Sequence, residues 1–383
     1  MFIRPILIRF IKKFFFYIKN MNDFVKILYK NNYLYAKTYF FLNIYLPRHE
    51  WDKISVLLET FGYKKKKNFF FINNKILKKF SYYELYIFYF YFRMNLSFAS
   101  QLVLRNELIK KISPKSKDYL KSRMSMQKFN YKKLKKFDIH EELLVYNKKK
   151  IHRYEPKSAD NLFSKKIQNR SVAIVGPSNS KVLRGQEIDN FDIVIRTNCT
   201  KILNKPTKVF GKKTSVIYFN SHRVRVDLRN IKKISNRVEW LVFKSQNDLK
   251  KTGLKKKSLR VSKSPQNLMY LSYPMALQII IFDILRFNPS KVKLFHFDLY
   301  SGSKAYNKNY KHFDLSKKDI SNSIRAHDMI GCFNFTKQFY DLKLIDIDDR
   351  SCKILKSSLS SYVKKLDGLY GKIKYNYGNQ PIF

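Results

Sequence analysis

Polar side chains suited to binding a phosphorylated ligand follow a short apolar run near the middle of the chain. Gly176, Ser178 and Asn179 come directly after the run Val172–Val175. A glycine lets the backbone approach a ligand closely, and Ser and Asn side chains can donate hydrogen bonds to a phosphate or a ribose. The alternative is an ordinary turn, because a Gly-Pro pair often ends a strand without any ligand.

Two asparagines follow the next apolar runs. Asn198 comes shortly after Ile193–Ile195, and Asn220 comes directly after Ser215–Phe219. An Asn side chain both donates and accepts hydrogen bonds, so it can recognise the edge of a pyrimidine or a ribose. The alternative for each asparagine is a turn role without a ligand.

Two tyrosines and one histidine further along the chain could take part in a reaction. Tyr300 and Tyr306 follow the run Val292–Phe297, and their hydroxyls could hold a departing phosphate. His327 precedes a predicted helix, and a histidine titrates in the range that suits a general base near neutral pH. Because the chain has 27 tyrosines, the pair could also be a chance occurrence, and a single histidine is often structural.

The elements that must position these residues alternate between strands and helices. The predicted strands are Val172–Val175, Ile193–Ile195, Ser215–Phe219, Trp240–Phe243 and Val292–Phe297, and the predicted helices include Met275–Leu285 and Phe333–Tyr340. This alternation is typical of βαβ units. It predicts an α/β, Rossmann-like fold with a mainly parallel sheet flanked by helices. Such sheets bind nucleotides at the carboxyl edge, where the polar residues are expected.

The first part of the chain has a different composition. It contains one glycine, Gly62, in residues 1–165 and is rich in Lys, Phe, Tyr and Leu. It is expected to be mainly helical, with one small strand pair near Lys64–Ile76. The stretch Asn147–Lys166 is the best boundary, which gives an N-terminal region of residues 1–165 and a catalytic domain of residues 166–383. Apolar residues between Ile3 and Ile18 recur at helical spacing opposite basic ones, so this helix could lie on an anionic bilayer or pack on its own domain.

Charge and cysteine content limit the class of protein. A net charge of +50 favours an anionic partner such as nucleic acid or a membrane surface, but an AT-rich genome enriches lysine in the same way. Three cysteines without metal spacing indicate a reducing compartment. The chain has no uncharged apolar run of about 18 residues, so no transmembrane helix is expected.

One segment resembles a known family. The string GQEIDNFDIVIRTN, which ends at Asn198, resembles the L-motif of the sialyltransferase superfamily. The matching residues are Glu187, Ile188, Asp189, Asp192, Val194, Arg196 and Asn198. The order of later features, across about Ser171–Ile345, resembles the bacterial CMP-sialic acid-dependent glycosyltransferases. The chain departs from that pattern at the residues flanking Gly176 and at Tyr273-Pro274, which leaves the exact sugar donor open.

The resemblance implies a fold, an activity and a site. It implies a GT-A-variant, sialyltransferase-like domain that works as an inverting, metal-independent glycosyltransferase. The enzyme would need no cofactor and would transfer sialic acid or a related nonulosonic sugar from a CMP-sugar to a bacterial surface glycan, either lipopolysaccharide (lipooligosaccharide) or capsule. It would be cytoplasmic and peripheral on the inner face of the cell membrane. The implied nucleotide-binding residues are Gly176, Ser178, Asn179, Asn198, Asn220 and Ser272, and the implied catalytic residues are Tyr300 and Tyr306 on the phosphate and His327 as the base.

Two other classes of protein are consistent with the sequence. A basic nucleic-acid-binding protein would explain the charge but not the ordered polar residues after the strands, and the chain contains no recognised binding module. A catalytically degenerate transferase fold used as a scaffold would explain the departures from the family pattern.

Overall fold

The computed structural model describes residues 64–66, 69–71, 85, 89, 97–111, 157–199, 207–255, 258–262, 274–302, 320, 324 and 327–370. The chain divides into two compact units. The first comprises Met1–Ser113 with Tyr370–Phe383, and the second comprises Pro114–Leu369.

The described part of the first unit contains a hairpin and a helix. Strands β1 (Lys64–Lys66) and β2 (Phe69–Phe71) pair antiparallel, which confirms the strand pair predicted near Lys64–Ile76. Helix α7 (Phe98–Lys110) begins at Ser97, whose side chain accepts a hydrogen bond from the Ser100 amide. The amphipathic helix predicted near the N-terminus lies outside the described residues.

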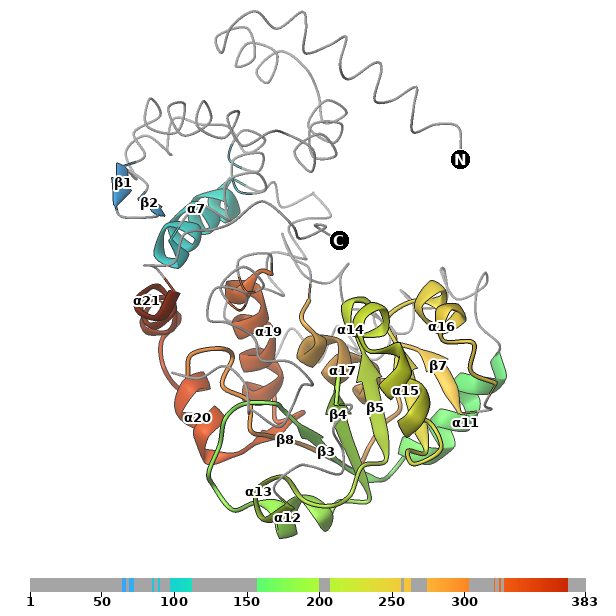
Figure 1. Ribbon diagram of the computed structural model, residues 1–383. Helices are drawn as coiled ribbons and strands as arrows, with labels where there is room; N and C mark the ends of the chain where they lie inside the picture. Colours follow the sequence, from blue (N-terminus) through green and yellow to red (C-terminus); the bar gives the residue numbers. More distant parts are fainter. Residues whose placement is uncertain are drawn as a thin grey trace, which may run out of the picture. The chain divides into compact units, whose positions relative to one another are not determined.

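The second unit contains a seven-stranded sheet in which every strand pair is parallel (Figure 1). The strands are β3 (Ser171–Val175), β4 (Ile193–Thr197), β5 (Val216–Phe219), β6 (Trp240–Phe243), β7 (Leu259–Val261), β8 (Lys291–Phe295) and β9 (Asp346–Ile347). Their order across the sheet is β7-β6-β5-β4-β3-β8-β9. This confirms the predicted α/β, Rossmann-like parallel sheet and all five predicted strands, while β7 and β9 were not predicted.

Helices connect the strands and cover the sheet. They are α11 (Lys157–Ile167), α12 (Gly185–Asp189), α13 (Thr207–Phe210), α14 (Ser221–Val226), α15 (Leu228–Ile234), α16 (Gln246–Thr252), α17 (Ala276–Leu285), α19 (Met329–Asp341), α20 (Asp349–Leu355) and α21 (Leu359–Tyr370). The predicted helices near Met275–Leu285 and Phe333–Tyr340 correspond to α17 and α19. The predicted boundary at residue 165 falls within α11, whose Phe163 packs edge-on against Trp240 and Phe287 in the second unit.

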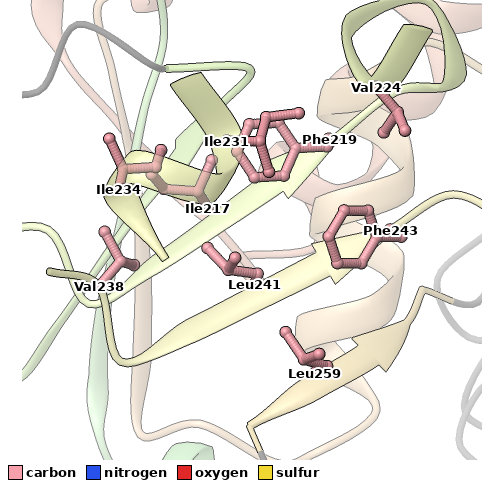
Figure 2. Close-up of a cluster of buried hydrophobic side chains, with 9 residues drawn as sticks. All are labelled: Ile217, Phe219, Val224, Ile231, Ile234, Val238, Leu241, Phe243 and Leu259. Carbon is pink, nitrogen blue, oxygen red and sulfur yellow. The ribbon is translucent and has the colours of Figure 1, made fainter. Parts of the chain in front are cut away.

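One hydrophobic cluster shows how the sheet holds its helices. Alternate residues of β5 and β6 point to the same face of the sheet, where Val224 of α14 and Ile231 and Ile234 of α15 pack on them (Figure 2). The full buried set is Ile217, Phe219, Val224, Ile231, Ile234, Val238, Leu241, Phe243 and Leu259. Burial of each such side chain contributes about 1.5–3 kcal/mol to folding, so this cluster fixes where α14 starts relative to the end of β5.

The connections between strands create a switch point in the sheet. From β3 the chain proceeds outward through β4, β5, β6 and β7, and it then crosses to β8 on the other side of β3. The loops after β3 and β8 therefore leave the carboxyl edge in diverging directions. Ligands of open α/β sheets bind at such a point.

Candidate functional site

Three of the sequence-predicted residues follow neighbouring strands at the carboxyl edge of the sheet. In the register, Val175 of β3 pairs with Arg196 of β4, and Thr197 pairs with Tyr218 of β5. Ser178, Asn198 and Asn220 therefore lie just beyond the ends of three adjacent strands. Because adjacent strands are about 4.8 Å apart, one nucleotide could span this row.

The two asparagines are joined directly. The Asn198 side-chain oxygen accepts a hydrogen bond of 2.9 Å from the Asn220 backbone amide. The Asn220 side-chain oxygen accepts one of 2.7 Å from the Arg223 amide and so caps α14. Asn198 has a left-handed backbone with φ 49°, which asparagine tolerates better than most residues. In the described part of the chain, neither side-chain NH₂ group has a hydrogen-bond partner, so both donors are available to a ligand.

Ser178 has a buried hydroxyl group without a partner. The residue is 2% exposed, its backbone amide donates to the His296 carbonyl, and its Oγ makes no hydrogen bond to any described residue. A buried polar group without a partner costs about 1–3 kcal/mol, and native structures contain few of them. A hydroxyl of this kind at a switch point is suited to donate to a bound ligand.

Gly176 is required by the protein's own packing. Its amide donates to the Phe295 carbonyl at 2.7 Å. A Cβ at this position would lie 2.6 Å from the His296 carbonyl oxygen and 2.8 Å from the Phe297 ring. The close backbone approach is therefore made to the loop after β8. A ligand contact at Gly176 stays a prediction.

The loop after β8 has an unusual backbone. His296, Leu299 and Tyr300 all have positive φ, at 57°, 45° and 61°. Non-glycine residues in this region each cost about 1–3 kcal/mol and cluster at functional sites. Asp298 stabilises the loop, because its Oδ1 accepts from the Tyr300 amide at 3.0 Å.

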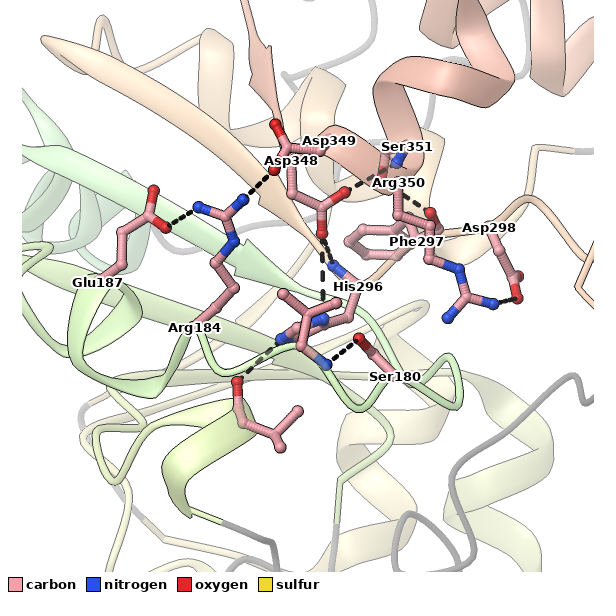
Figure 3. Close-up of polar contacts among 12 residues, drawn as sticks. Ser180, Arg184, Glu187, His296, Phe297, Asp298, Asp348, Asp349, Arg350 and Ser351 are labelled. Carbon is pink, nitrogen blue, oxygen red and sulfur yellow. Dashed lines mark hydrogen bonds and ion pairs between the residues drawn. The ribbon is translucent and has the colours of Figure 1, made fainter.

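Arg350 links this loop to the loop after β3. Its guanidinium donates to the Asp298 carboxylate at 3.1 Å (Figure 3). It also donates to the Asn179 carbonyl at 2.8 Å. Burial raises the pKa of Asp298 to about 6, in spite of the opposing effect of Arg350. Arg350, which holds both loops together, is therefore paired with a carboxyl group, that of Asp298, whose charge changes between about pH 5 and 7.

Asp348 fixes the first residue of the β8 loop. Its Oδ2 accepts from the His296 amide at 2.6 Å, and its Oδ1 caps α20 at the Ser351 amide. The His296 ring contacts the Val209 carbonyl through Nε2 at 2.9 Å, and burial lowers the pKa of this ring. His296 is therefore neutral at pH 7 with its proton on Nε2, and it anchors the loop to α13.

Two residues of the segment that resembles the L-motif make hydrogen bonds within the protein. Arg196 lies inside β4, is 4% exposed, and donates to the Phe210 and Lys213 carbonyls. Asp189 accepts from the Lys212 and Lys213 amides, each at 2.8 Å. The side chain of Arg196 therefore holds the protein together, and the first candidate ligand-binding residue after β4 is Asn198.

The remaining predicted residues are placed only in part. His327 lies two residues before the start of α19, which is capped by Asp328 and leads into β9, a strand parallel to β8. The helix therefore begins at the carboxyl edge of the sheet, the edge at which Asn198 follows β4. Tyr300 lies in the β8 loop, whereas Tyr306 and Ser272 lie outside the described residues.

The described residues contain neither a metal-ligand cluster nor a membrane-spanning helix. No group of three or more His, Cys, Asp or Glu side chains there could hold a metal ion. No helix there is both long and apolar enough to cross a membrane. Metal independence and peripheral membrane association stay predictions.

Comparison with known proteins adds no relative. No protein-family model matches the chain, and no curated protein matches it significantly. The resemblance to the sialyltransferases therefore rests on the residues quoted above, and what is shown is a Rossmann-like parallel sheet.

Proposed function

We propose that the chain is an inverting glycosyltransferase that transfers sialic acid or a related nonulosonic sugar from a CMP-sugar to a surface-glycan acceptor. The observation that carries the proposal is the row of Ser178, Asn198 and Asn220 at the carboxyl edge. It supplies a buried hydroxyl and two side-chain NH₂ groups, none of which has a hydrogen-bond partner among the described residues, next to the switch point. These are neutral donors, which suit a nucleoside and its phosphate.

The proposed roles follow from the chemistry of each group. Asn198 and Asn220 would bind the cytidine and its ribose, and Ser178 with Ser272 would bind the phosphate side of CMP. Tyr300 and Tyr306 would donate to the phosphate as its bond to the anomeric carbon breaks. His327 would take the proton from the acceptor hydroxyl as that oxygen forms its bond to the opposite face of the anomeric carbon. General-base help of this kind contributes about 10²–10⁴-fold to the rate.

The test is release of CMP from CMP-sialic acid by the purified full chain. We expect hydrolysis without acceptor, faster transfer with a lipid-linked or soluble glycan, and no requirement for added metal. His327→Ala should lower turnover by about 10²-fold or more, whereas CMP should still raise the melting temperature of this variant. Asn198→Ala should weaken that stabilisation by CMP.

A matched control separates binding from structure. Asn230→Ala changes an asparagine on α15 that bonds to Asp227 and lies away from the row, so CMP binding should be unaffected. If CMP stabilises the protein but no CMP-sugar is turned over, the chain is a scaffold. If neither CMP nor CMP-sialic acid binds, the proposal is wrong.

A further inference from the structure

The helices α14, α15 and α16 carry an excess of positive charge. Residues 221–255 contain ten Lys and Arg residues and three acidic residues. The three helices contact one another and lie side by side in Figure 1. Eight of the basic side chains are exposed and make no ion pair in the described part of the chain. We call these eight the basic face: Arg225, Arg229, Lys232, Lys233, Arg237, Lys250, Lys251 and Lys255.

The acidic residues of these helices do not offset this charge. Asp227 is buried and pairs with Arg223 at 3.0 Å, and Asp248 is buried and accepts from two serine hydroxyls. Glu239 is exposed but pairs with Lys166 at 2.9 Å. The acidic residues therefore do not neutralise the basic face, and each of its eight side chains contributes close to one positive charge to the surface.

The charge is not a uniform property of this unit. Residues 341–370, which form the end of α19 together with β9, α20 and α21, contain six Lys and Arg residues and five acidic residues. Two of these acidic residues pair with lysines outside the segment, Asp341 with Lys337 and Asp346 with Lys291. A lysine-rich composition imposed by the genome acts on both segments alike, so it does not explain the difference between them.

The folding pattern turns the basic residues of α15 outward. Val224, Ile231 and Ile234 point toward β5 and β6 in the buried cluster of Figure 2. On α15 the basic residues Arg229, Lys232 and Lys233 occupy positions i, i+3 and i+4, which place them on one side of the helix. Val226, at the end of α14, is 52% exposed beside Arg225.

From this arrangement we infer that the basic face docks on an anionic phospholipid bilayer. Each Lys or Arg near an anionic membrane surface contributes about 1 kcal/mol of attraction, and an exposed valine can enter the headgroup layer. The face offers little to a single-stranded nucleic acid, which binds through stacking on exposed aromatic rings. The two aromatic residues of this segment, Trp240 and Phe243, are both buried. The inference does not depend on the proposed sugar donor.

The experiment measures cosedimentation of the full chain with phosphatidylglycerol vesicles and with phosphatidylcholine vesicles. The test variant is Arg229→Gln, Lys232→Gln and Lys233→Gln together. The matched control is Lys353→Gln, Lys356→Gln and Lys364→Gln, three exposed lysines of the same unit on α20, its C-cap and α21. Both variants lower the net charge by the same amount and remove no ion pair between described residues.

We expect the wild type to bind phosphatidylglycerol and not phosphatidylcholine. The test variant should bind phosphatidylglycerol on the order of 100-fold more weakly, which is about 3 kcal/mol. The control variant should change by less than about threefold, because charges more than a Debye length from the surface are screened. A charge-retaining variant, Arg229→Lys with Lys232→Arg and Lys233→Arg, should bind like the wild type.

Three results would overturn the inference. Equal weakening by the test and control variants would mean that net charge alone drives binding. An unchanged affinity of the test variant would place the contact elsewhere, for example in residues 3–18. In a parallel measurement with a duplex DNA, loss of DNA binding by a test variant that still binds vesicles fully would assign the basic face to nucleic acid.

Discussion

At the scale of single residues, the hydroxyl of Ser178 gives the sharpest prediction. It is buried without a partner, so Ser178→Ala removes an unsatisfied group. We expect the free energy of unfolding without ligand to stay the same or rise by up to about 1 kcal/mol. If Ser178 donates to CMP, the same variant should bind CMP roughly tenfold more weakly, because a hydrogen bond to a charged group contributes about 1.5–3 kcal/mol.

Ser180 in the same loop provides the control. It is also buried, but its Oγ accepts from the Val182 amide at 3.2 Å. Ser180→Ala should therefore lower the free energy of unfolding by about 0.5–1.5 kcal/mol. Denaturant melts and CMP-dependent thermal shifts measure both quantities. If Ser178→Ala were as destabilising as Ser180→Ala and CMP binding were unchanged, Ser178 would be a structural residue only.

The raised pKa of Asp298 predicts how the free energy of unfolding depends on pH. Its pKa is raised by burial from 3.8 to about 6, so the folded protein binds this proton more tightly than the unfolded chain does. Its contribution to stability is therefore present below about pH 4 and is lost as the pH rises through 6. Relative to Asp298→Asn, the wild type should lose up to about 3 kcal/mol of unfolding free energy between pH 4 and 7, since one pKa unit corresponds to about 1.4 kcal/mol.

For Asp192 we expect the opposite change of unfolding free energy with pH, so this residue serves as a control. Hydrogen bonds from the Ser171 amide and hydroxyl lower the pKa of Asp192. Its contribution is present above its ordinary pKa and is lost on acidification, so the wild type should lose stability relative to Asp192→Asn as the pH falls below 4. Urea melts from pH 3 to 8 test both variants. A flat difference between wild type and Asp298→Asn would contradict the assignment.

Some site residues could be predicted from the sequence and others could not. Ser178, Asn198 and Asn220 each follow an apolar run closely, and parallel strands bring their carboxyl ends together whatever the details of packing. Arg350 and Asp348 come from a distant part of the chain and reach the loops after β3 and β8 only because β9 pairs with β8. No local spacing signals such a contact.

At the scale of elements, the contact between α12 and α13 gives the next prediction. A Cβ at Gly185 would lie 2.0 Å from the Thr207 carbonyl oxygen, so Gly185→Ala must push the two helices apart. Overpacking of this kind usually costs about 1–3 kcal/mol and sometimes more. We expect a loss of unfolding free energy at the upper end of this range, measured by denaturant melts.

Gly368 in α21 is the matched control for Gly185. A Cβ there meets no atom within 4 Å. Because alanine is favoured over glycine in a helix by about 1 kcal/mol, Gly368→Ala should leave stability unchanged or raise it. A Gly185→Ala variant as stable as the wild type would show that α12 can move away from α13 without cost.

Strands β7 and β9 could not be predicted from the sequence, and each has a physical reason. The run that forms β7 contains Arg260, which is 2% exposed and would normally argue against a buried strand. It is buried because Asp283 and Asp160 accept from it at 2.5 Å and 2.7 Å, and its guanidinium lies over the Phe163 ring. β9 has two residues, too few for any periodic pattern. In both cases distant partners decide the structure.

At the scale of the whole molecule, charge is distributed unevenly over a strongly basic chain. The net charge is +50, and among the described segments of the second unit residues 221–255 contain ten basic and three acidic residues, while residues 341–370 contain six basic and five acidic ones. The sequence therefore predicted an anionic partner without placing it, because total charge says nothing about which helix faces turn outward. The buried cluster under α14 and α15 decides that orientation.

The same net charge predicts how salt affects stability. Like charges held together in a compact state repel one another, and added salt screens this repulsion. The Debye length falls from about 30 Å at 0.01 M to about 10 Å at 0.1 M and about 3 Å at 1 M. We therefore expect the melting temperature of the full chain at pH 7 to rise by a few degrees, roughly 1 kcal/mol of stability, between about 0.02 and 0.3 M sodium chloride. The rise should then level off as screening becomes complete, and potassium chloride should give the same curve.

Chloride salts are required because sulfate also stabilises proteins by exclusion from their surface. The variant with Arg229, Lys232 and Lys233 all changed to Gln should start from a higher melting temperature at low salt, since it lacks three exposed positive charges on one side of α15. A melting temperature that stays flat or falls with salt would mean that attractive ion pairs, such as Arg350 with Asp298, outweigh the repulsion among the exposed lysines.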